Sequence, residues 1–421
     1  MEVRFSIFGE RLTSPTGILQ LMEDLGRALT APGPVYMLGG GNPAKIPQVT
    51  RFFQERLQAL ARDVQRFQRA FTDYAEPQGL GEFREAIARA LRARYGWPIG
   101  PENVVLTNGS QNAFAFLFNL LAGPTSDGGF RRILLPVLPE YIGYADTGWV
   151  SDIFLVLRPS LEELEAPFYK YRVDLSRLPD GEDIAAVCVS RPTNPTGNVL
   201  TQEEVEALAR WSKARGIPFI IDNAYGAPFP YILFTEAEPY WDEHVVLCLS
   251  LSKLGLPGVR TGIVIAPEPL AAALGRMNAI FTLAPGNVGA GLVLDLVASG
   301  EIFDLGPRYI RPFYQAKRDQ ALEWLAAFMG DVPYRVHLPE GTFFLWLWFP
   351  ELPIPSQALY ERLKARGVLV VPGEYFFPGL QEPWEHQEQC LRVNVAGPEA
   401  VVKTGLRLLA EEVRRVHEMQ G

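Results

Sequence analysis

The chain has 421 residues, of which 48% are apolar and 21% are charged, and its formal net charge at pH 7 is -9. A chain of this length exceeds one ordinary hydrophobic core, so we expect one large and one small domain. The negative charge and the lack of a Lys/Arg-rich block argue against a nucleic-acid partner. The longest apolar stretches, such as residues 342–349, are far too short to cross a bilayer, so we expect no membrane partner.

The sequence carries no signature of secretion, of disulfide bonds or of a metal site. Its N-terminal residues lack the apolar core of a secretion signal. The three cysteines, Cys188, Cys248 and Cys390, are an odd number and lie mostly in apolar strands, as core residues of a cytosolic protein do. The four histidines are scattered, and no His/Cys pair has metal-ligand spacing. We therefore expect a cytoplasmic protein that binds no metal.

The middle of the chain alternates between strand-like and helix-like segments. Helices are predicted at 110–121 and at 201–215, the latter opened by a capping box of Thr201 and Glu204. Such alternation is typical of an α/β domain with a mostly parallel central sheet, whose active groups lie at the carboxyl ends of the strands. Strands are predicted at 103–106, 132–135, 153–157, 185–190, 218–222, 245–249 and 262–266.

The last quarter reads as a smaller α+β domain. A long helix is predicted at 308–329, followed by a strand pair around 334–349, a helix at 356–366, a strand at 391–395 and a closing helix from Pro398. We divide the chain into an N-terminal segment that joins the small domain (1–46), a large domain (47–305) and the small domain (306–421).

Polar residues follow several predicted strands. After 103–106 the motif TNGSQNA turns into a helix, and backbone N–H groups at a helix start, together with Ser110, suit a phosphate. A plain helix cap is the alternative explanation. Asn194 follows the strand 185–190, in a turn whose composition has a structural explanation of its own. Asp222 ends the next strand, with Tyr225 close behind; Asp222 alone could equally bind Mg²⁺ or a ribose.

Lys253 follows the apolar strand 245–249, and lysine is almost never fully buried without a partner. One reading is a solvated loop lysine. The other is an amine nucleophile for Schiff-base chemistry, with Ser250, Ser252 and Arg260 nearby to hold a phosphate. The motif alone leaves both readings open.

A competing phosphate motif lies at residues 39–44, where GGGNPA formally fits G-x-G-x-x-G/A. Only a short apolar stretch precedes it, prolines interrupt the turn that follows, and the expected acidic residue is missing. This disfavours a dinucleotide-binding fold and favours a close backbone approach to a ligand.

Taken together, the groups at the strand ends are those that pyridoxal phosphate requires. Lys253 would bond the aldehyde, and Asp222 would keep the pyridine nitrogen protonated so that the ring can absorb electrons. Asn194 and Tyr225 would contact the ring's phenolate oxygen. The phosphate would be held by Ser110, Ser250, Ser252 and Arg260.

The motifs TNGSQNA, RPTNPTG, DNAY and SLSKLGLPGVRTG resemble those of the fold-type-I pyridoxal-phosphate aminotransferases. The last motif and the opening FSIFGERLTSPTGILQLMEDLG look most like the valine–pyruvate branch, including a loop from Lys253 to Arg260 that is one residue shorter than the common pattern. The resemblance implies a large domain that binds the cofactor, with Gly109, Ser110 and Gln111 at the phosphate.

The resemblance also implies roles for residues outside these motifs. Tyr141 would stack on the pyridine ring, and Tyr74 would reach the phosphate in the neighbouring subunit of a homodimer. Arg392 would fork onto the substrate α-carboxylate, with Gly41 and Asn194 beside it. Read without the family, Arg392 would be a strand residue paired with a surface carboxylate, and both tyrosines would be half-buried aromatics.

The implied function is transfer of the amino group from valine to pyruvate, which yields 3-methyl-2-oxobutanoate and alanine. A related aminotransferase or a β-lyase on the same scaffold is the alternative; the intact Lys253 and the poor glycine fingerprint disfavour a non-catalytic regulator and a nicotinamide dehydrogenase. We expect a small apolar substrate side chain, with residues 372–377 and Tyr36 either lining its pocket or packing between domains.

Overall fold

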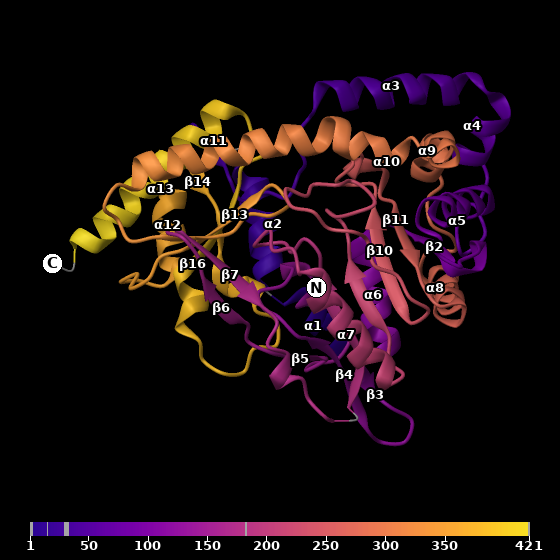
Figure 1. Cartoon of the computed structure of the whole chain (residues 1–421), viewed down its shortest axis with the longest axis horizontal. Helices are drawn as coiled ribbons and strands as arrows, with labels where there is room; N and C mark the ends of the chain where they lie inside the picture. Colours follow the sequence, from indigo (N-terminus) through magenta and orange to yellow (C-terminus); the bar gives the residue numbers. More distant parts are fainter. Residues whose placement is uncertain (1–2, 15, 29–32, 182, 420–421) are drawn as a thin grey trace.

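A computed structural model describes residues 3–14, 16–28, 33–181 and 183–419 of the chain. Two β-sheets dominate this part, each packed against helices, as Figure 1 shows. The α/β class expected from the sequence is confirmed.

The larger sheet has eight strands in the order β2-β11-β10-β9-β8-β4-β3, with β5 also paired to β4. Its strands lie within two residues of the predicted ones, and only the short β3 was not predicted. Their bounds are β2 Val104–Thr107, β3 Gly123–Pro124, β4 Phe130–Leu135, β5 Phe154–Val156, β8 Ile184–Ser190, β9 Phe219–Asp222, β10 Val245–Ser250 and β11 Gly262–Ile265.

The sheet is mixed rather than uniformly parallel. Strands β5, β4, β8, β9 and β10 pair in parallel, as alternation with helices predicts. Strand β11 runs antiparallel to both β10 and β2, because only a loop and a short helical turn connect it to β10. The parallel strands therefore end at one edge, where their last residues can meet.

Helices pack on and beside this sheet. Helix α6 (Ser110–Leu121) contacts β10 and β11, and α7 (Gln202–Ala214) contacts β8 and β9. The predicted capping box opens α7: the Thr201 hydroxyl accepts from the Glu204 N–H, and the Glu204 carboxylate accepts from the Thr201 N–H. The other helices of this part are α3 Pro47–Arg62, α4 Val64–Phe71, α5 Gly81–Tyr95, α8 Glu268–Phe281, α9 Val288–Ser299 and α10 Ile302–Leu305.

The second sheet has six strands in the order β15-β16-β13-β12-β7-β6. Its hairpin β6–β7 comes from the middle of the chain, and β7 pairs in parallel with β12, an arrangement that the sequence did not predict. Helices α11 (Arg311–Met329), α12 (Ser356–Ala365) and α13 (Glu399–Glu418) accompany it, close to their predicted ranges. The strands are β6 Ser160–Glu163, β7 Phe168–Arg172, β12 Arg335–His337, β13 Phe344–Trp348, β15 Val371–Pro372 and β16 Cys390–Asn394.

The N-terminal segment lies against the C-terminal part of the chain. Strand β1 (Tyr36–Met37) pairs in parallel with β14 (Val368–Leu369). The buried Asp24 of α2 (Gly17–Ala28) accepts hydrogen bonds from Tyr360 and Lys364 of α12. The first helix, α1 (Ile7–Thr13), has no buried residue.

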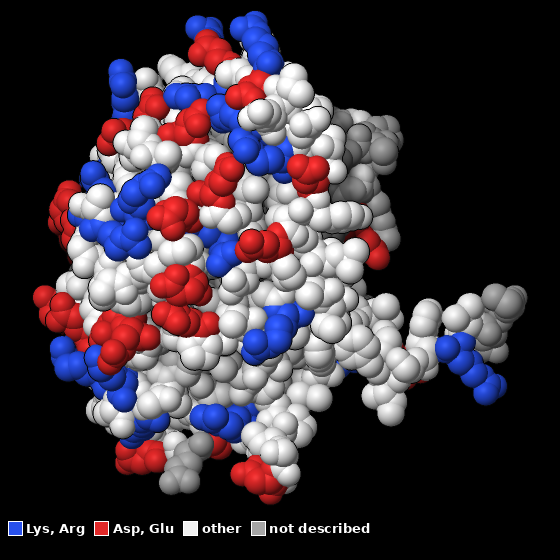
Figure 2. All heavy atoms as spheres, turned by 90° about the vertical axis from the view of Figure 1, so that its right-hand side faces the viewer, with Lys and Arg blue, Asp and Glu red and all other residues white. Residues whose placement is uncertain are grey.

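Buried apolar side chains form one large cluster around the first sheet and a second around β13, β16, α11 and α13. Two cores fit the expected large and small domains, although the boundaries at 46 and 305 stay a prediction. No helix in the described ranges is long and apolar enough to cross a membrane. Figure 2 shows positive and negative side chains interspersed over one face of the molecule, without an extended basic surface.

Candidate active site

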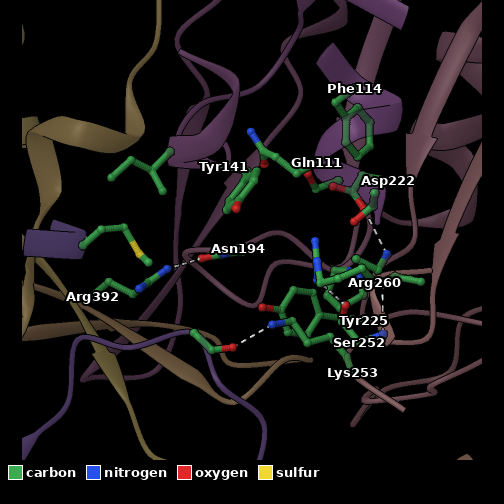
Figure 3. Close-up of a pocket in the computed structure, with 18 residues that line it drawn as sticks. Gln111, Phe114, Tyr141, Asn194, Asp222, Tyr225, Ser252, Lys253, Arg260 and Arg392 are labelled. Carbon is green, nitrogen blue, oxygen red and sulfur yellow. Dashed lines mark hydrogen bonds between the residues drawn. The ribbon is translucent and has the colours of Figure 1, made fainter. Parts of the chain in front are cut away.

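A pocket lies where the large sheet's strand ends meet the second sheet. Neighbouring strands bring its polar groups together, because Ser190 of β8 and Cys248 of β10 are both in register with Asp222 of β9. Nearly all the predicted site residues line it, as Figure 3 shows for the labelled ones. They are Gly41, Ser110, Gln111, Tyr141, Asn194, Asp222, Tyr225, Ser250, Ser252, Lys253, Arg260 and Arg392.

Lys253 points into the pocket, and its Nζ donates a hydrogen bond to the Gly41 carbonyl at 2.6 Å. Burial and the charges of Arg392 and Arg260 lower its pKa to about 8, against an opposing effect of Asp222. About a tenth of the amine is therefore neutral at pH 7, far more than for an ordinary lysine, and the neutral form is the one that acts as a nucleophile or a general base.

Asp222 ends β9 as a buried carboxyl. Its Oδ2 accepts a hydrogen bond from the Tyr144 hydroxyl at 2.8 Å, and its Oδ1 accepts one from the Ala224 N–H at 2.9 Å. Burial raises its pKa to about 6, although both hydrogen bonds and the nearby Lys253 oppose the shift. A buried carboxyl of this kind is suited to pairing with a positively charged ring nitrogen.

The start of α6 and the loop after β10 form a cradle suited to an anion. Gly109 precedes α6 with a φ of 86°, and a Cβ there would lie 2.3 Å from an Arg260 guanidinium nitrogen, so only glycine fits. Arg260 Nη1 lies 3.4 Å from Ser252 Oγ. Despite the short loop, the guanidinium thus lies beside the free N–H groups of the helix start, as a phosphate site requires.

Arg392 reaches the pocket from β16 of the second sheet. It is buried; Nη1 donates to Asn194 Oδ1 at 2.8 Å, and Nη2 donates to the Gly39 carbonyl at 2.7 Å. Its Nε is buried with no partner among the described atoms, and its guanidinium lies 4.3 Å from the centroid of the Phe344 ring. Burial lowers its pKa to about 10, so the group stays charged at neutral pH. A buried, charged donor with an unused N–H is suited to a carboxylate.

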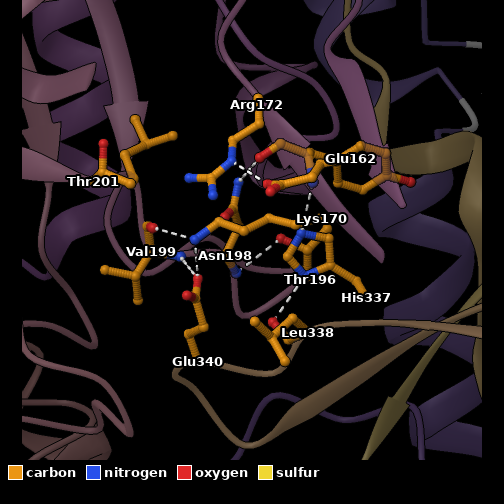
Figure 4. Close-up of polar contacts among 12 residues, drawn as sticks. Glu162, Lys170, Arg172, Thr196, Asn198, Val199, Thr201, His337, Leu338 and Glu340 are labelled. Atoms are coloured by element: carbon orange, nitrogen blue, oxygen red, sulfur yellow. Dashed lines mark hydrogen bonds and ion pairs between the residues drawn. The ribbon is translucent and has the colours of Figure 1, made fainter. Parts of the chain in front are cut away.

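The turn that carries Asn194 is clamped from behind by a buried ion pair, shown in Figure 4. Lys170 of β7 lies 2.6 Å from Glu340 and also donates to the Val199 carbonyl at 3.1 Å. The same Glu340 oxygen accepts from the Val199 N–H. The N–H and the C=O of Val199 are thereby both held, which fixes the segment that follows the turn of Asn194.

Some predicted residues lie elsewhere. Tyr74 is 85% exposed and lies outside the pocket of its own chain, so its role at a neighbouring subunit stays a prediction. Tyr36 packs against the second core and is not among the pocket residues, which favours its packing role. The segment 372–377 does not line the pocket either, although Phe376 lies 5.1 Å from the Arg392 guanidinium.

Several residues in or beside the pocket were not predicted from the sequence; those in its lining are Met22, Phe114, Ile142, Ser190, Pro192 and Ala224. Glu140, Tyr144 and Ser190 form buried polar contacts next to Asp222, and Met22 of α2 lies in the pocket lining. The one signal in the sequence was Glu140 itself, an acidic residue within an otherwise apolar stretch. Among the described residues, no cluster of three side chains suited to a metal ion occurs.

Comparisons with known proteins agree with this geometry. The family model for aminotransferase class I and II matches residues 38–409. The chain belongs to this aminotransferase family. It is 47% identical, over 98% of each chain, to the valine–pyruvate aminotransferase of Escherichia coli K12.

Two solved structures resemble the aminotransferase over nearly its whole length. One is a putative amino-acid aminotransferase from Psychrobacter arcticum 273-4, with a TM-score of 0.96, 45% identity and coverage of 99% of this chain and 100% of that one. The other is valine-pyruvate aminotransferase from Salmonella typhimurium LT2, with a TM-score of 0.88, 45% identity and coverage of 96% and 100%.

Aminotransferases of this family use pyridoxal phosphate, and the pocket fits that group. The glycine at 109 would leave room for an anion beside Arg260, Asp222 could pair with a ring nitrogen, and Lys253 would supply the amine. Membership of the family excludes the dehydrogenase reading, and the glycine run at 39–41 instead brings backbone carbonyls to Arg392 and Lys253.

Proposed function

We propose that this aminotransferase exchanges the amino group of small neutral amino acids, with L-valine and pyruvate giving 3-methyl-2-oxobutanoate and L-alanine. The observation that carries the proposal is the set of cations in the pocket. Among its described lining residues these are Lys253, Arg260 and Arg392. With Lys253 at the cofactor aldehyde and Arg260 at the phosphate, Arg392 alone is left for a substrate carboxylate, so a second carboxylate would lack a partner. The similarity to valine–pyruvate aminotransferases over the full chain supports the same substrates.

Bound pyridoxal phosphate supplies the electron sink that lets the substrate α-carbon lose its proton. Arg392 and Asn194 would hold the substrate carboxylate beside Lys253. The neutral Nζ of Lys253 would take the α-proton as a general base and, as a general acid, pass it to the cofactor rather than back to the α-carbon. Asp222 would keep the ring nitrogen protonated, and Tyr141 and Tyr225 would lie against the ring.

We further propose that the enzyme acts in the cytoplasm as a homodimer in which Tyr74 reaches the partner's phosphate. Large apolar side chains are exposed on α1, at the end of α8 and just after it, including Ile7, Ile280 and Leu283. Clusters of such residues are uncommon on monomers and typical of interfaces. The three cysteines are buried and unpaired, as suits a reducing compartment.

A substrate screen tests the proposal. We expect valine, alanine and 2-aminobutyrate to react with pyruvate with kcat/KM values within about two orders of magnitude, because one methylene changes binding by only about 1–3 kcal/mol. Aspartate should react far more slowly, because its second carboxylate would be buried without a partner. A kcat/KM for aspartate equal to that for valine would contradict the assignment. Release of pyruvate and ammonia from cysteine conjugates without an oxo acid would instead indicate a β-lyase.

A further inference from the structure

A second carboxyl group, that of Glu140, lies buried behind the pocket and takes no part in the mechanism proposed above. Glu140 follows β4 directly before Tyr141, and its side chain is fully buried. Its Oε1 accepts from the Ser190 N–H at 2.8 Å, and its Oε2 accepts from the Tyr141 N–H at 3.2 Å. The Ser190 hydroxyl lies 2.6 Å from the same Oε2. Glu140 is therefore fixed on both oxygens.

Two hydroxyl groups connect this carboxyl to the one that faces the pocket. Ser190 Oγ lies 3.3 Å from the Tyr144 hydroxyl, which in turn donates to Asp222 Oδ2 at 2.8 Å. The four residues come from four separate segments: the loop after β4, the end of β8, a short helix at Ile142–Tyr144 and the end of β9. The result is one continuous row of oxygen contacts from Glu140 to Asp222.

The number of hydrogens decides how this row can be bonded. If both carboxyls are ionised, Ser190 gives its single hydrogen to Glu140 and Tyr144 gives its own to Asp222, so nothing bridges Ser190 and Tyr144. If Glu140 is a neutral acid, it donates to Ser190, Ser190 donates to Tyr144, and Tyr144 donates to Asp222. Only neutral Glu140 provides a hydrogen for every contact in the row, and each hydrogen bond then donates in the direction of Asp222.

The electrostatics favour the same arrangement. Burial raises the pKa of Glu140 to about 8, above the value of about 6 for Asp222, and the charge of Asp222 adds to the shift. Burial also raises the pKa values of the neighbouring Tyr144 and Cys188, so both stay neutral. With two buried carboxyls close together, only one ionises readily, and that one is Asp222.

We propose that Glu140 is a positioning residue, a neutral acid whose hydrogen bonds through Ser190 and Tyr144 hold Asp222 as the ionised carboxylate that faces the cofactor ring. The inference rests on the role proposed above for Asp222. It adds a second carboxyl, two hydroxyls and a direction of donation to the machinery that supports the ring nitrogen.

Stability of the full chain stripped of cofactor gives the first test, with Glu140→Gln as the variant. A glutamine can donate to Ser190 Oγ and accept from the Ser190 N–H; it gives up only the longer contact from the Tyr141 N–H, and it cannot ionise. The folded-state pKa of Glu140 lies above its ordinary value of 4.5. Neutral Glu140 therefore contributes fully to the stability of the folded wild type below about pH 4.5, and this contribution is lost as the pH rises to about 8. We therefore expect the margin, defined as the unfolding midpoint of Glu140→Gln minus that of the wild type, to grow from pH 5 to pH 8. A margin that is constant or shrinks over this range would overturn the proposal.

Cofactor affinity of the stripped protein gives the second test, measured by absorbance titration with pyridoxal phosphate. We expect Tyr144→Phe to weaken binding at least tenfold, because Asp222 Oδ2 loses its hydroxyl donor while the aromatic ring at position 144 keeps its packing against Phe114 and Phe118. Glu140→Leu should weaken it similarly, whereas the conservative Glu140→Gln should restore affinity to within threefold of the wild type. Unchanged affinity in Tyr144→Phe, or a Glu140→Gln as weak as Glu140→Leu, would overturn the proposal.

An Asp222→Asn variant in the same series separates this inference from the function beneath it. Near-native turnover in Asp222→Asn would remove Asp222 from the ring nitrogen, and the proposed chemistry would fail with it. Loss of turnover in Asp222→Asn together with unchanged affinity in Tyr144→Phe would leave the chemistry intact and refute only the row of hydrogen bonds.

Discussion

Replacing Arg392 with lysine tests whether this residue, which connects the two sheets, binds the substrate carboxylate. The guanidinium already bonds to Asn194 and Gly39, and its Nε remains for a ligand. A lysine keeps the charge but offers a single nitrogen, which cannot contact Asn194, Gly39 and a carboxylate in the same fixed plane. Hydrogen bonds to charged groups contribute about 1.5–3 kcal/mol each, so loss of two costs about 3–6 kcal/mol. This corresponds to a fall in kcat/KM of about a hundred- to ten-thousand-fold.

The assay compares alanine with ethylamine, which is alanine without its carboxylate, in the first half-reaction followed by cofactor absorbance. In Arg392→Lys we expect the alanine rate to fall by that factor while the slow ethylamine rate changes less than threefold. Arg335→Lys, on β12 of the same sheet, is the matched control, because its pair with Glu163 at 3.7 Å is exposed and contributes little. An equal fall for both amines would show that Arg392 supports the fold or the cofactor instead of reading the carboxylate.

Four further outcomes are expected. Borohydride reduction of the holoenzyme should fix the cofactor to Lys253 in a peptide map, and an adduct on another lysine would refute the central assignment. Asp222→Asn should still bind cofactor but lose most of its turnover, because an amide cannot keep the ring nitrogen protonated. Mixing inactive Lys253→Ala with inactive Tyr74→Ala subunits should restore up to about a quarter of wild-type activity, since half of the dimers then hold one intact site; a fully active monomer would exclude this. Lys170→Met alone should destabilise the protein to urea by about 3–5 kcal/mol, because it leaves Glu340 buried and unpaired, and the double variant with Glu340→Gln should recover most of the loss; equal losses in both would contradict this reading.

Much of the site could be predicted because its residues sit at strand ends, and strand ends are local features. The apolar stretches before Asp222 and Lys253 mark buried strands, and parallel strands bring their carboxyl ends to one edge. The family resemblance then supplied Arg392 and Tyr141, which no local pattern distinguishes from ordinary strand or half-buried residues. Arg392 and Tyr141 were thus identified by the family resemblance and not by the hydrophobic periodicity.

What the sequence could not reveal depends on contacts between distant segments. The hairpin β6–β7 has ordinary strand composition, and nothing in it indicates pairing with β12, whose partner residues lie more than 160 positions later. Glu140 reads locally as a loop acid, and only the packing of β8 and β9 beside it shows that it is buried next to Ser190. Burial and pairing of this kind are set by the whole fold, so a single sequence does not display them.

The contact between Asn194 and Arg392 joins the cofactor side of the pocket to the substrate side. Asn194 follows β8 of the large sheet, Arg392 lies on β16 of the second, and 2.8 Å separates their bonded atoms. Asn194 is therefore held from both sides: it follows β8, its side chain bonds Arg392, and the segment after its turn bonds Lys170 and Glu340 at Val199. The contact fixes the separation between the proposed substrate arginine and the amide on the cofactor side. A fixed separation would keep the substrate carboxylate aligned with the cofactor ring, as a transfer between two different amino acids in one pocket requires.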